Sequence, residues 1–417
     1  MIILRRLKAA GAEARIWRTQ FGFKSKHGTA DAIFLARRLL DESCASQNSP
    51  LILLALDWAK AFDSVMPDAL LEALRRFGLP PEVLGAVRAI YSGRSFAVKD
   101  SGLTSTSREQ RAGICQGCPL SPFLFAMVMT VLLSDAKRSL GDLSELVDEL
   151  VYADDTLIVA SAPGHAEQYM KAVERAGANY GLNFNWGKLE VLSVGSDAVV
   201  RRPDGGAISQ KTSIVYLGSV LSADGTMQAE LGRRLGQARA EFDLLCRVWN
   251  RSSIPVNRKI LVYEACVQTK LLYSLHTSWF KRDELARIDA FQARCLRKIL
   301  GIQHSYVSRV SNESVLARAR RMKLSSVLLQ RQLMYFFKVA CKGDDHPLRS
   351  AIFKPSSLDL RPPSGKRKRS RPRQTWSAEL YKLASDVCAS LEVSIDQLRT
   401  IPVRDWKQAV LSFCLAR

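Results

Sequence analysis

Apolar and polar positions follow one pattern up to about Met227 and another pattern after it. In the first part, the short continuous apolar run 51–56 predicts a strand that is buried on both faces. The run 150–160 places two adjacent acids between apolar and β-branched residues, which predicts strand, tight turn, strand with the acids at the tip. Apolar residues at helical spacing, with Gly and Pro boundaries, predict helices over 31–41, 68–78 and 166–180 and one opening at Ser121.

After Met227 helical patterns dominate, rich in Arg and Lys, and aromatic residues are interleaved with them. These aromatics fit an ordinary helix core as well as they fit a nucleic-acid surface. The segment 358–373 holds several prolines and a basic run from Lys366 to Arg373, which predicts a linker. We expect the basic run to contact nucleic acid or to direct nuclear import, with a merely solvated charge run as the alternative.

The composition is globular, and 417 residues allow two or three subdomains with a substantial core. The net charge of +21 suits a polyanionic partner, nucleic acid first and an anionic membrane surface second. The longest uncharged apolar run, 123–133, is too short to cross a bilayer, and we expect no signal peptide. The nine scattered cysteines indicate reduced thiols, and the lone Cys115-x-x-Cys118 pair does not predict zinc.

Two segments carry acids where metal chemistry needs them. Asp154 and Asp155 are adjacent, so their charges repel unless a cation neutralises them, and Mg²⁺ prefers such oxygens. Asp57 ends the buried run 51–56, where it is well placed to share that ion. Taken singly, the acids also fit plain turn and capping chemistry. A third segment, 113–122, is a Gly/Pro loop in which Gly117 lets the backbone approach a flat ligand.

Together these segments resemble the palm motifs of reverse transcriptases, most closely those of non-LTR (LINE-type) retrotransposons. The segments are LD…AFD from Asp57 to Asp63, QG…LSP from Gln116 to Pro122, and YADD from Tyr152 to Asp155. They occur in the order and at the approximate spacing of the family. The resemblance covers roughly residues 16 to 376, and its weaker segments are QFGF at 20–23 with 29–31, GLNFN at 181–185 with 188–190, YLG at 216–218 and RCLRKILGI at 294–302.

The resemblance implies an α+β fold of the right-hand polymerase type, with an antiparallel palm sheet and a helical C-terminal extension. The expected parts are partial fingers at 1–50, a palm with inserted fingers elements at 51–225, a helical thumb at 226–300, and a basic helical region at 301–417 with its linker at 358–373. It also implies that this chain is the C-terminal part of a larger element protein or a truncated copy, without an endonuclease domain and with a short fingers region.

The resemblance assigns a role to each candidate residue. Asp57 and Asp154 would bridge two Mg²⁺ ions (Mn²⁺ is the alternative), with Asp155 assisting, and Lys188 would act on the pyrophosphate as a catalytic residue. Phe62 would exclude a 2′-hydroxyl, although it also fits a core position. The other substrate-binding residues are Trp58 (through its backbone carbonyl), Gln116, Gly117 and Tyr152, and the primer grip is Tyr216, Leu217 and Gly218.

The expected function is therefore RNA-directed DNA polymerisation. The expected partners are an RNA template, a DNA primer or target, and deoxynucleoside triphosphates, in the nucleus after a cytoplasmic ribonucleoprotein stage. We expect no membrane partner, and the oligomeric state stays open. The alternatives are a catalytically weak or inactive nucleic-acid-binding remnant, a group II intron-type maturase and an RNA-templated RNA polymerase.

Overall fold

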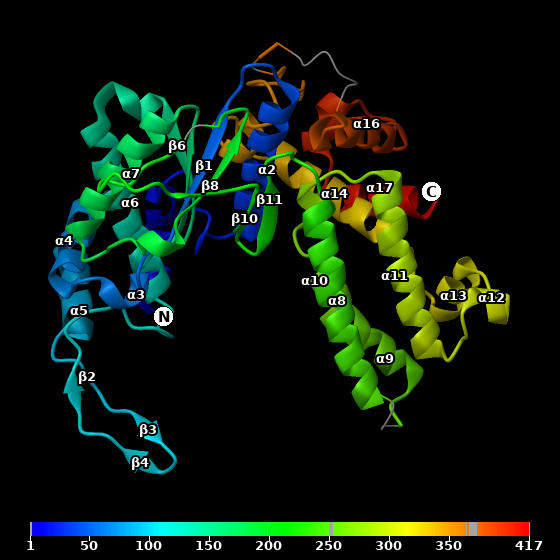
Figure 1. The fold of residues 1–417 in the computed structure, drawn as a ribbon, viewed down its shortest axis with the longest axis horizontal. Helices are drawn as coiled ribbons and strands as arrows, with labels where there is room; N and C mark the ends of the chain where they lie inside the picture. Colours follow the sequence, from blue (N-terminus) through cyan, green and yellow to red (C-terminus); the bar gives the residue numbers. More distant parts are fainter. Residues whose placement is uncertain (1, 198, 250–252, 364, 367–372, 417) are drawn as a thin grey trace. The chain divides into compact units, whose positions relative to one another are not determined.

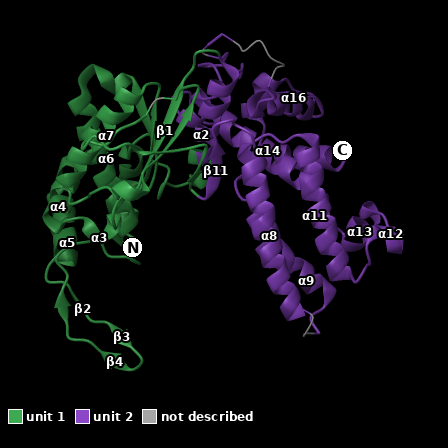
Figure 2. Ribbon diagram, in the orientation of Figure 1, with its two compact units in different colours: residues 1–32, 47–217 green, residues 33–46, 218–417 purple. Residues whose placement is uncertain are grey.

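The computed structural model describes residues 2–197, 199–249, 253–363, 365–366 and 373–416. The chain divides into two compact units. Unit 1 comprises residues 1–32 and 47–217, and unit 2 comprises residues 33–46 and 218–417, as the two colours of Figure 2 show. Most of the basic run after Lys366 lies outside the described residues. No helix in the described part of the chain combines the length and apolarity that a bilayer span requires.

Unit 1 is built around a five-stranded sheet (Figure 1). Its strand order is β6-β7-β1-β8-β9, and every neighbouring pair is antiparallel except β8 and β9. β1 lies in the middle of the sheet. Its side chains are buried on both faces, which explains its unbroken apolar sequence. The strand bounds are β6 Val147–Tyr152, β7 Asp155–Ala160, β1 Leu51–Leu56, β8 Glu190–Val194 and β9 Ser209–Lys211.

Helices complete the core of unit 1. α6 packs against α7 and α4, and α7 also packs against β7. The part of α6 over residues 123–133 is apolar nearly all round and is almost entirely buried in this core, whereas its last turns are polar and partly exposed. The helix bounds are α1 Ile2–Ala9, α3 Ala61–Ser64, α4 Pro67–Phe77, α5 Pro81–Tyr91, α6 Ser121–Leu140 and α7 Pro163–Ala178.

Two short strand pairs form a hairpin between α5 and the Gly113 loop. β2 (Ser95–Phe96) pairs with β5 (Arg108–Glu109), and β3 (Lys99–Asp100) pairs with β4 (Leu103–Thr104). All of these strand residues are exposed. The last strand of unit 1 is β10, Ser213–Tyr216.

Unit 2 is mainly helical and has an apolar core of its own. It consists of two segments of the chain. The first contains most of α2 (Thr29–Ala45), and the first strand of the second is β11 (Ser219–Ser222). α8 and α11 both contribute to its core. The remaining helix bounds are α8 Gln228–Trp249, α9 Val256–Val262, α10 Thr269–Leu272, α11 Arg282–Leu300, α12 Ser305–Ser308, α13 Asn312–Ala319, α14 Leu324–Ala340, α15 Pro347–Ser350, α16 Trp376–Ala389 and α17 Val403–Leu415.

Candidate active site

The acidic residues lie at one end of the unit 1 sheet. Asp57 directly follows β1, and Asp154 lies in the turn between β6 and β7, whose last pair is Tyr152 with Asp155. Because β1 and β7 are antiparallel neighbours with Leu56 opposite Thr156, the end of β1 lies beside the start of β7. The predicted arrangement of strand, tight turn and strand with the acids at the tip is confirmed.

Neighbouring carboxylate charges act on Asp154 and on Asp155. Burial raises the pKa of Asp154, and the charge of Asp57 raises it further. Partial desolvation, followed by the charges of Asp154 and Asp57, raises the pKa of Asp155 to about 6, although this residue remains accessible to solvent. Like charges in a partly dry environment favour protonation, and a cation would reverse that preference.

A carboxylate set of this kind fits a hard divalent cation, which prefers oxygen ligands. Within the described residues, no three His, Cys, Asp or Glu side chains come together closely enough to form a complete set of metal ligands. Lys188 forms an ion pair with one of the acids, with its Nζ 3.7 Å from Asp57 Oδ2. Both partners are exposed, so this ion pair contributes little to stability. The metal roles of the three aspartates therefore stay a prediction.

The turn that carries Asp154 is held by a residue to which the sequence analysis gave no role. The fully buried Gln20 accepts a hydrogen bond from Ala153 N (2.8 Å) and donates one to Ala153 O (3.0 Å). Ala153 needs this support because its φ of 60° lies in the left-handed region, which costs energy for residues other than glycine. Gly22 is tied to the same amide oxygen, since its N–H donates to Gln20 Oε1 at 2.8 Å.

Gly22 allows this close approach. A Cβ added to it would lie 2.4 Å from the backbone nitrogen of Ala153, so no larger residue fits without displacing the turn. The QFGF segment was recognisable in the sequence, but its contact with the acidic turn spans more than 130 residues. The only signal was the co-occurrence of Gln and Gly in a segment that resembles the family.

Phe62 and the Gln116 loop lie together. Gln116 Nε2 donates to Asp63 Oδ1 at 2.8 Å, and the amide of Ile114 donates to the carbonyl of Phe62 at 2.7 Å. The half-buried Phe62 ring stacks on Phe125 with centroids 4.3 Å apart. The ring of Phe62 is therefore packed in the core on one side and partly exposed to solvent. Asp63 is the hydrogen-bond acceptor of Gln116. These contacts fix the loop relative to α3.

The other candidate residues are placed as follows. The side chain of Trp58 is buried, which leaves only its backbone for a ligand. No heavy atom lies within 4 Å of a Cβ added to Gly117, so this part of the loop faces open space. Tyr152 is partly buried beside the turn. Tyr216 is buried, its hydroxyl is 3.3 Å from the carbonyl oxygen of Leu150, and burial, with the charge of Asp155, raises its pKa.

Leu217 and Gly218 both have positive φ, 46° and 70°, and form a tight turn directly after Tyr216. The carbonyl of Gly218 accepts a hydrogen bond from Arg233 at 2.8 Å and a second one from Arg234. The turn that we predicted as the primer grip is thus rigidly held. Its contact with a primer stays a prediction.

The family model described as reverse transcriptase (RNA-dependent DNA polymerase) matches residues 1–221, which include every predicted site residue from Asp57 to Gly218. The chain belongs to the reverse transcriptase family. The prediction of the non-LTR group is confirmed, as is the α+β fold of the right-hand polymerase type with its antiparallel palm sheet. The family's use of divalent metal ions agrees with the acidic end of the sheet.

Curated relatives come from mobile elements. The RNA-directed DNA polymerase from mobile element jockey of Drosophila funebris is 24% identical over 72% of this chain and 34% of its own length. The Pol polyprotein of element R2DM of Drosophila melanogaster is 31% identical over 34% of this chain and 13% of its own length. The chain thus spans about a third of the jockey protein and less of the R2DM polyprotein.

Solved telomerase structures are also similar to this chain. The telomerase of Candida albicans, in complex with a fragment of telomeric RNA, matches 75% of this chain and 55% of its own, at 12% identity and a TM-score of 0.43. That of Candida tropicalis, also with telomeric RNA, matches 81% of this chain and 53% of its own, at 13% identity and a TM-score of 0.40.

Proposed function

We propose that this chain polymerises DNA on an RNA template by transferring a deoxynucleotide to a primer 3′-hydroxyl. The observation that carries the proposal is the acidic end of the unit 1 sheet, where burial and the charge of Asp57 raise the pKa of both Asp154 and Asp155. Family membership supports the same reaction class. The partners would be an RNA template, a DNA primer or target, and deoxynucleoside triphosphates.

Asp57 and Asp154 would hold two Mg²⁺ ions, with Mn²⁺ as a substitute and Asp155 completing the site. Bound ions of this kind activate the attacking hydroxyl and stabilise the pyrophosphate that leaves. Gln20 would keep Asp154 in position through its two bonds to Ala153. Lys188, whose exposed ammonium group pairs with Asp57, would exchange that carboxylate for a phosphate oxygen of the nucleotide.

The nucleotide itself would lie against the loop that carries Gln116 and Gly117. The open space at Gly117 lets a base pair approach the backbone there. Phe62 would sit beneath the sugar, because its ring is only partly covered by Phe125. A ring in that position leaves no room for a 2′-hydroxyl, so deoxynucleotides would be selected.

Primer extension on poly(rA)/oligo(dT) with Mg²⁺ tests the proposal. The wild-type chain should incorporate dTTP, and Asp154→Asn should reduce incorporation by at least about a hundredfold, since it removes a metal ligand. Asp204→Asn is the matched control, because Asp204 is an exposed aspartate of the same unit. If primer and template bind normally but neither chain extends, this chain is a binding remnant and not a polymerase.

We also propose a nuclear location, supported by the basic run that starts at Lys366. The residues 367–372 of that run lie outside the described residues, so the argument is one of sequence alone. A fluorescent fusion in which Lys366, Arg367, Lys368 and Arg369 are changed to Gln should lose nuclear accumulation, whereas a fusion with Lys298→Gln and Arg294→Gln should keep it.

A further inference from the structure

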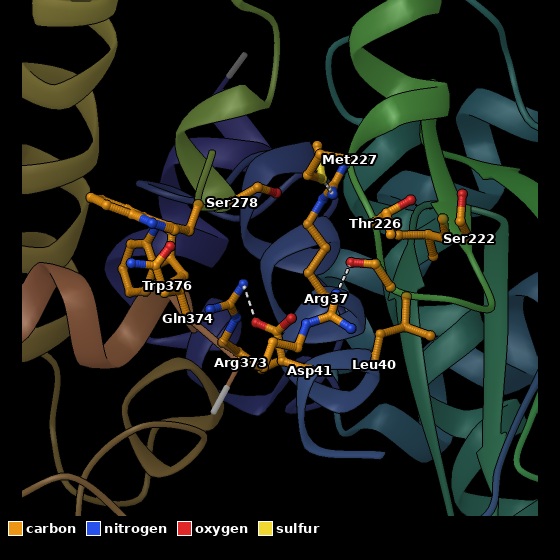
Figure 3. Close-up of a pocket in the computed structure, with 14 residues that line it drawn as sticks. Arg37, Leu40, Asp41, Ser222, Thr226, Met227, Ser278, Arg373, Gln374 and Trp376 are labelled. Atoms are coloured by element: carbon orange, nitrogen blue, oxygen red, sulfur yellow. Dashed lines mark hydrogen bonds and ion pairs between the residues drawn. The ribbon is translucent and has the colours of Figure 1, made fainter. Parts of the chain in front are cut away.

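Unit 2 holds a cavity of about 50 Å³ that none of the roles proposed above uses (Figure 3). It lies between the part of α2 that belongs to unit 2, the turn after β11, residues 278–279 and residues 373–376. The volume has room for roughly three to five water-sized groups, which is the size of one tetrahedral oxyanion. The lining residues are mostly polar or charged.

Arg38 is buried and incompletely paired. Its Nη2 lies 3.0 Å from the carbonyl oxygen of Thr277 and 3.1 Å from Asp41 Oδ2. The guanidinium is held between aromatic faces, 5.0 Å from the ring centre of Phe34 and 5.2 Å from that of Trp376. Its Nε and Nη1 have no hydrogen-bond partner among the described atoms. A buried donor without a partner raises the free energy of the folded state, so a ligand that accepts hydrogen bonds from these two N–H groups would stabilise it.

Arg37, the residue before Arg38, also has a buried N–H group without a hydrogen-bond partner among the described residues. It is buried, and its Nη2 donates to Ser219 Oγ at 2.8 Å while Nη1 contacts the sulfur of Met227. Its Nε again has no partner within the described part of the structure. Arg373 adds a third guanidinium to the lining and is fixed there by donating to the carbonyls of Asp224 (3.0 Å) and Gly225.

The charges at the cavity do not balance. Among the described residues that line the cavity, Asp41 is the one carboxylate, against three arginines. Glu230 lies near Arg37, but its oxygens already accept hydrogen bonds from Arg234 (2.7 Å) and from the Val220 amide (2.8 Å). Burial lowers the pKa of Arg37 to about 10, which still leaves it charged at neutral pH. Buried positive charge of this kind is normally compensated by an anion.

We propose that this cavity binds a phosphate group, with Arg37, Arg38 and Arg373 as its ligands. Guanidinium groups match the oxygens of a phosphate in geometry as well as in charge. The phosphate is either one phosphodiester of a bound nucleic-acid strand or free inorganic phosphate, because both present the same oxygens. All described residues of this site belong to unit 2, and its test does not require polymerase activity.

Two variants at the cavity give opposite expectations. Arg38→Gln removes a ligand charge and should weaken binding of inorganic phosphate at least tenfold. Asp41→Asn removes the competing carboxylate and frees Nη2 of Arg38, so it should tighten binding severalfold. Arg239→Gln is the matched control, since Arg239 is an exposed arginine of α8 and its loss changes the net charge equally. It should bind phosphate as the wild type does.

Phosphate is titrated against chloride at constant ionic strength and followed by tryptophan fluorescence, because Trp279 and Trp376 line the cavity. Saturable binding should also raise the thermal midpoint of the wild type. The proposal is overturned if phosphate has no saturable effect, or if Arg38→Gln and Arg239→Gln bind it equally. If Arg38→Gln does not fold, Asp41→Asn decides, and unchanged affinity in that variant overturns the proposal.

The source of the phosphate is identified with a labelled single-stranded oligonucleotide. If the cavity holds a backbone phosphate, Arg38→Gln should flatten the dependence of log K on log salt by about one unit, and inorganic phosphate should compete with the oligonucleotide. If it holds free phosphate, the two chains should bind the oligonucleotide alike while differing in phosphate affinity. Either pattern supports a phosphate site.

Discussion

At the scale of single residues, the site depends on side chains that hold the backbone as much as on those that carry charge. Asp154 sits beside Ala153, whose left-handed backbone is stabilised by Gln20. Replacing Gln20 therefore changes the position of Asp154, the proposed metal ligand, without altering Asp154 itself. The residue is a positioning residue, and its effect is expected on turnover more than on binding.

We expect Gln20→Ala to destabilise unit 1 by about 1–3 kcal/mol, because it leaves buried backbone groups of Ala153 and Gly22 without partners. It should lower kcat in primer extension at least tenfold while the affinity for primer and template changes little. Gln210→Ala, at an exposed position of β9, is the control and should match the wild type. Equal kcat values for the two variants would show that the turn at Ala153 and Asp154 keeps its conformation without Gln20.

Phe62 supports a second prediction at this scale. Phe62→Ala should raise the ratio of ribonucleotide to deoxynucleotide incorporation at least tenfold, since the ring no longer blocks the 2′-hydroxyl. Because the ring also stacks on Phe125, the same change should cost roughly 1–3 kcal/mol of stability, less than for a fully buried Phe. Phe125→Leu tests that part separately: it should destabilise the fold without altering sugar selectivity. Unchanged selectivity in an active Phe62→Ala chain would assign Phe62 to the core alone.

At the scale of helices and strands, a polar cluster connects α4, α6 and Tyr180, which lies just after the end of α7. Arg76 donates to Asp135 at 2.7 Å and to the hydroxyl of Tyr180 at 2.8 Å. The Arg76 hydrogen bond lowers the pKa of Asp135 below its usual range. A carboxyl with a lowered folded pKa stabilises the protein above its unfolded pKa, and this contribution is lost as the pH falls through the folded value.

Asp135→Asn should therefore reduce the free energy of unfolding by about 0.5–1 kcal/mol at pH 7, since Arg76 loses a charged partner but both side chains are partly exposed to solvent. The difference from the wild type should begin to shrink as the pH falls below about 4, where the unfolded carboxyl becomes protonated, and should vanish as the pH falls through the lowered pKa of the folded carboxyl. Urea unfolding at pH 7, 5 and 3.5 measures it, with Asp204→Asn as the control at an exposed site. A difference that stays constant with pH would mean that the charge of Asp135 is not responsible.

The sequence was a good guide to elements and a poor guide to the contacts between them. The strands around the acids and helices α4, α6 and α7 follow from local apolar spacing and from Gly and Pro boundaries. The parallel pairing of β9 with β8 does not, because β9 is three exposed residues with no apolar pattern. The Gln20 clamp and the buried pair Arg37 and Arg38 were also missed, since both depend on residues that are distant in the chain.

At the scale of the whole chain, the net charge of +21 sets how the protein meets a polyanion. Long-range attraction of this size is independent of base sequence and weakens as salt is added. It would bring nucleic acid to both units before any specific contact forms.

Changing Lys366, Arg367, Lys368 and Arg369 to Gln should weaken binding of unrelated oligonucleotides by similar factors. It should also flatten the salt dependence by about one unit of slope for each phosphate that the altered run no longer neutralises. Fluorescence anisotropy over a salt series measures both quantities. If affinity and slope are unchanged, the run makes no contact with nucleic acid. Primer extension at saturating template should stay normal, because the run lies outside the unit that holds the acids.

The division of α2 between the two units has a consequence for synthesis on the ribosome. Ile33 and Phe34 are fully buried, and the ring of Phe34 packs on Tyr335 and Trp376, which emerge some three hundred residues later. At roughly 5–20 residues per second, this apolar stretch waits on the order of half a minute for its partners. During that time it is a binding site for chaperones and a starting point for aggregation.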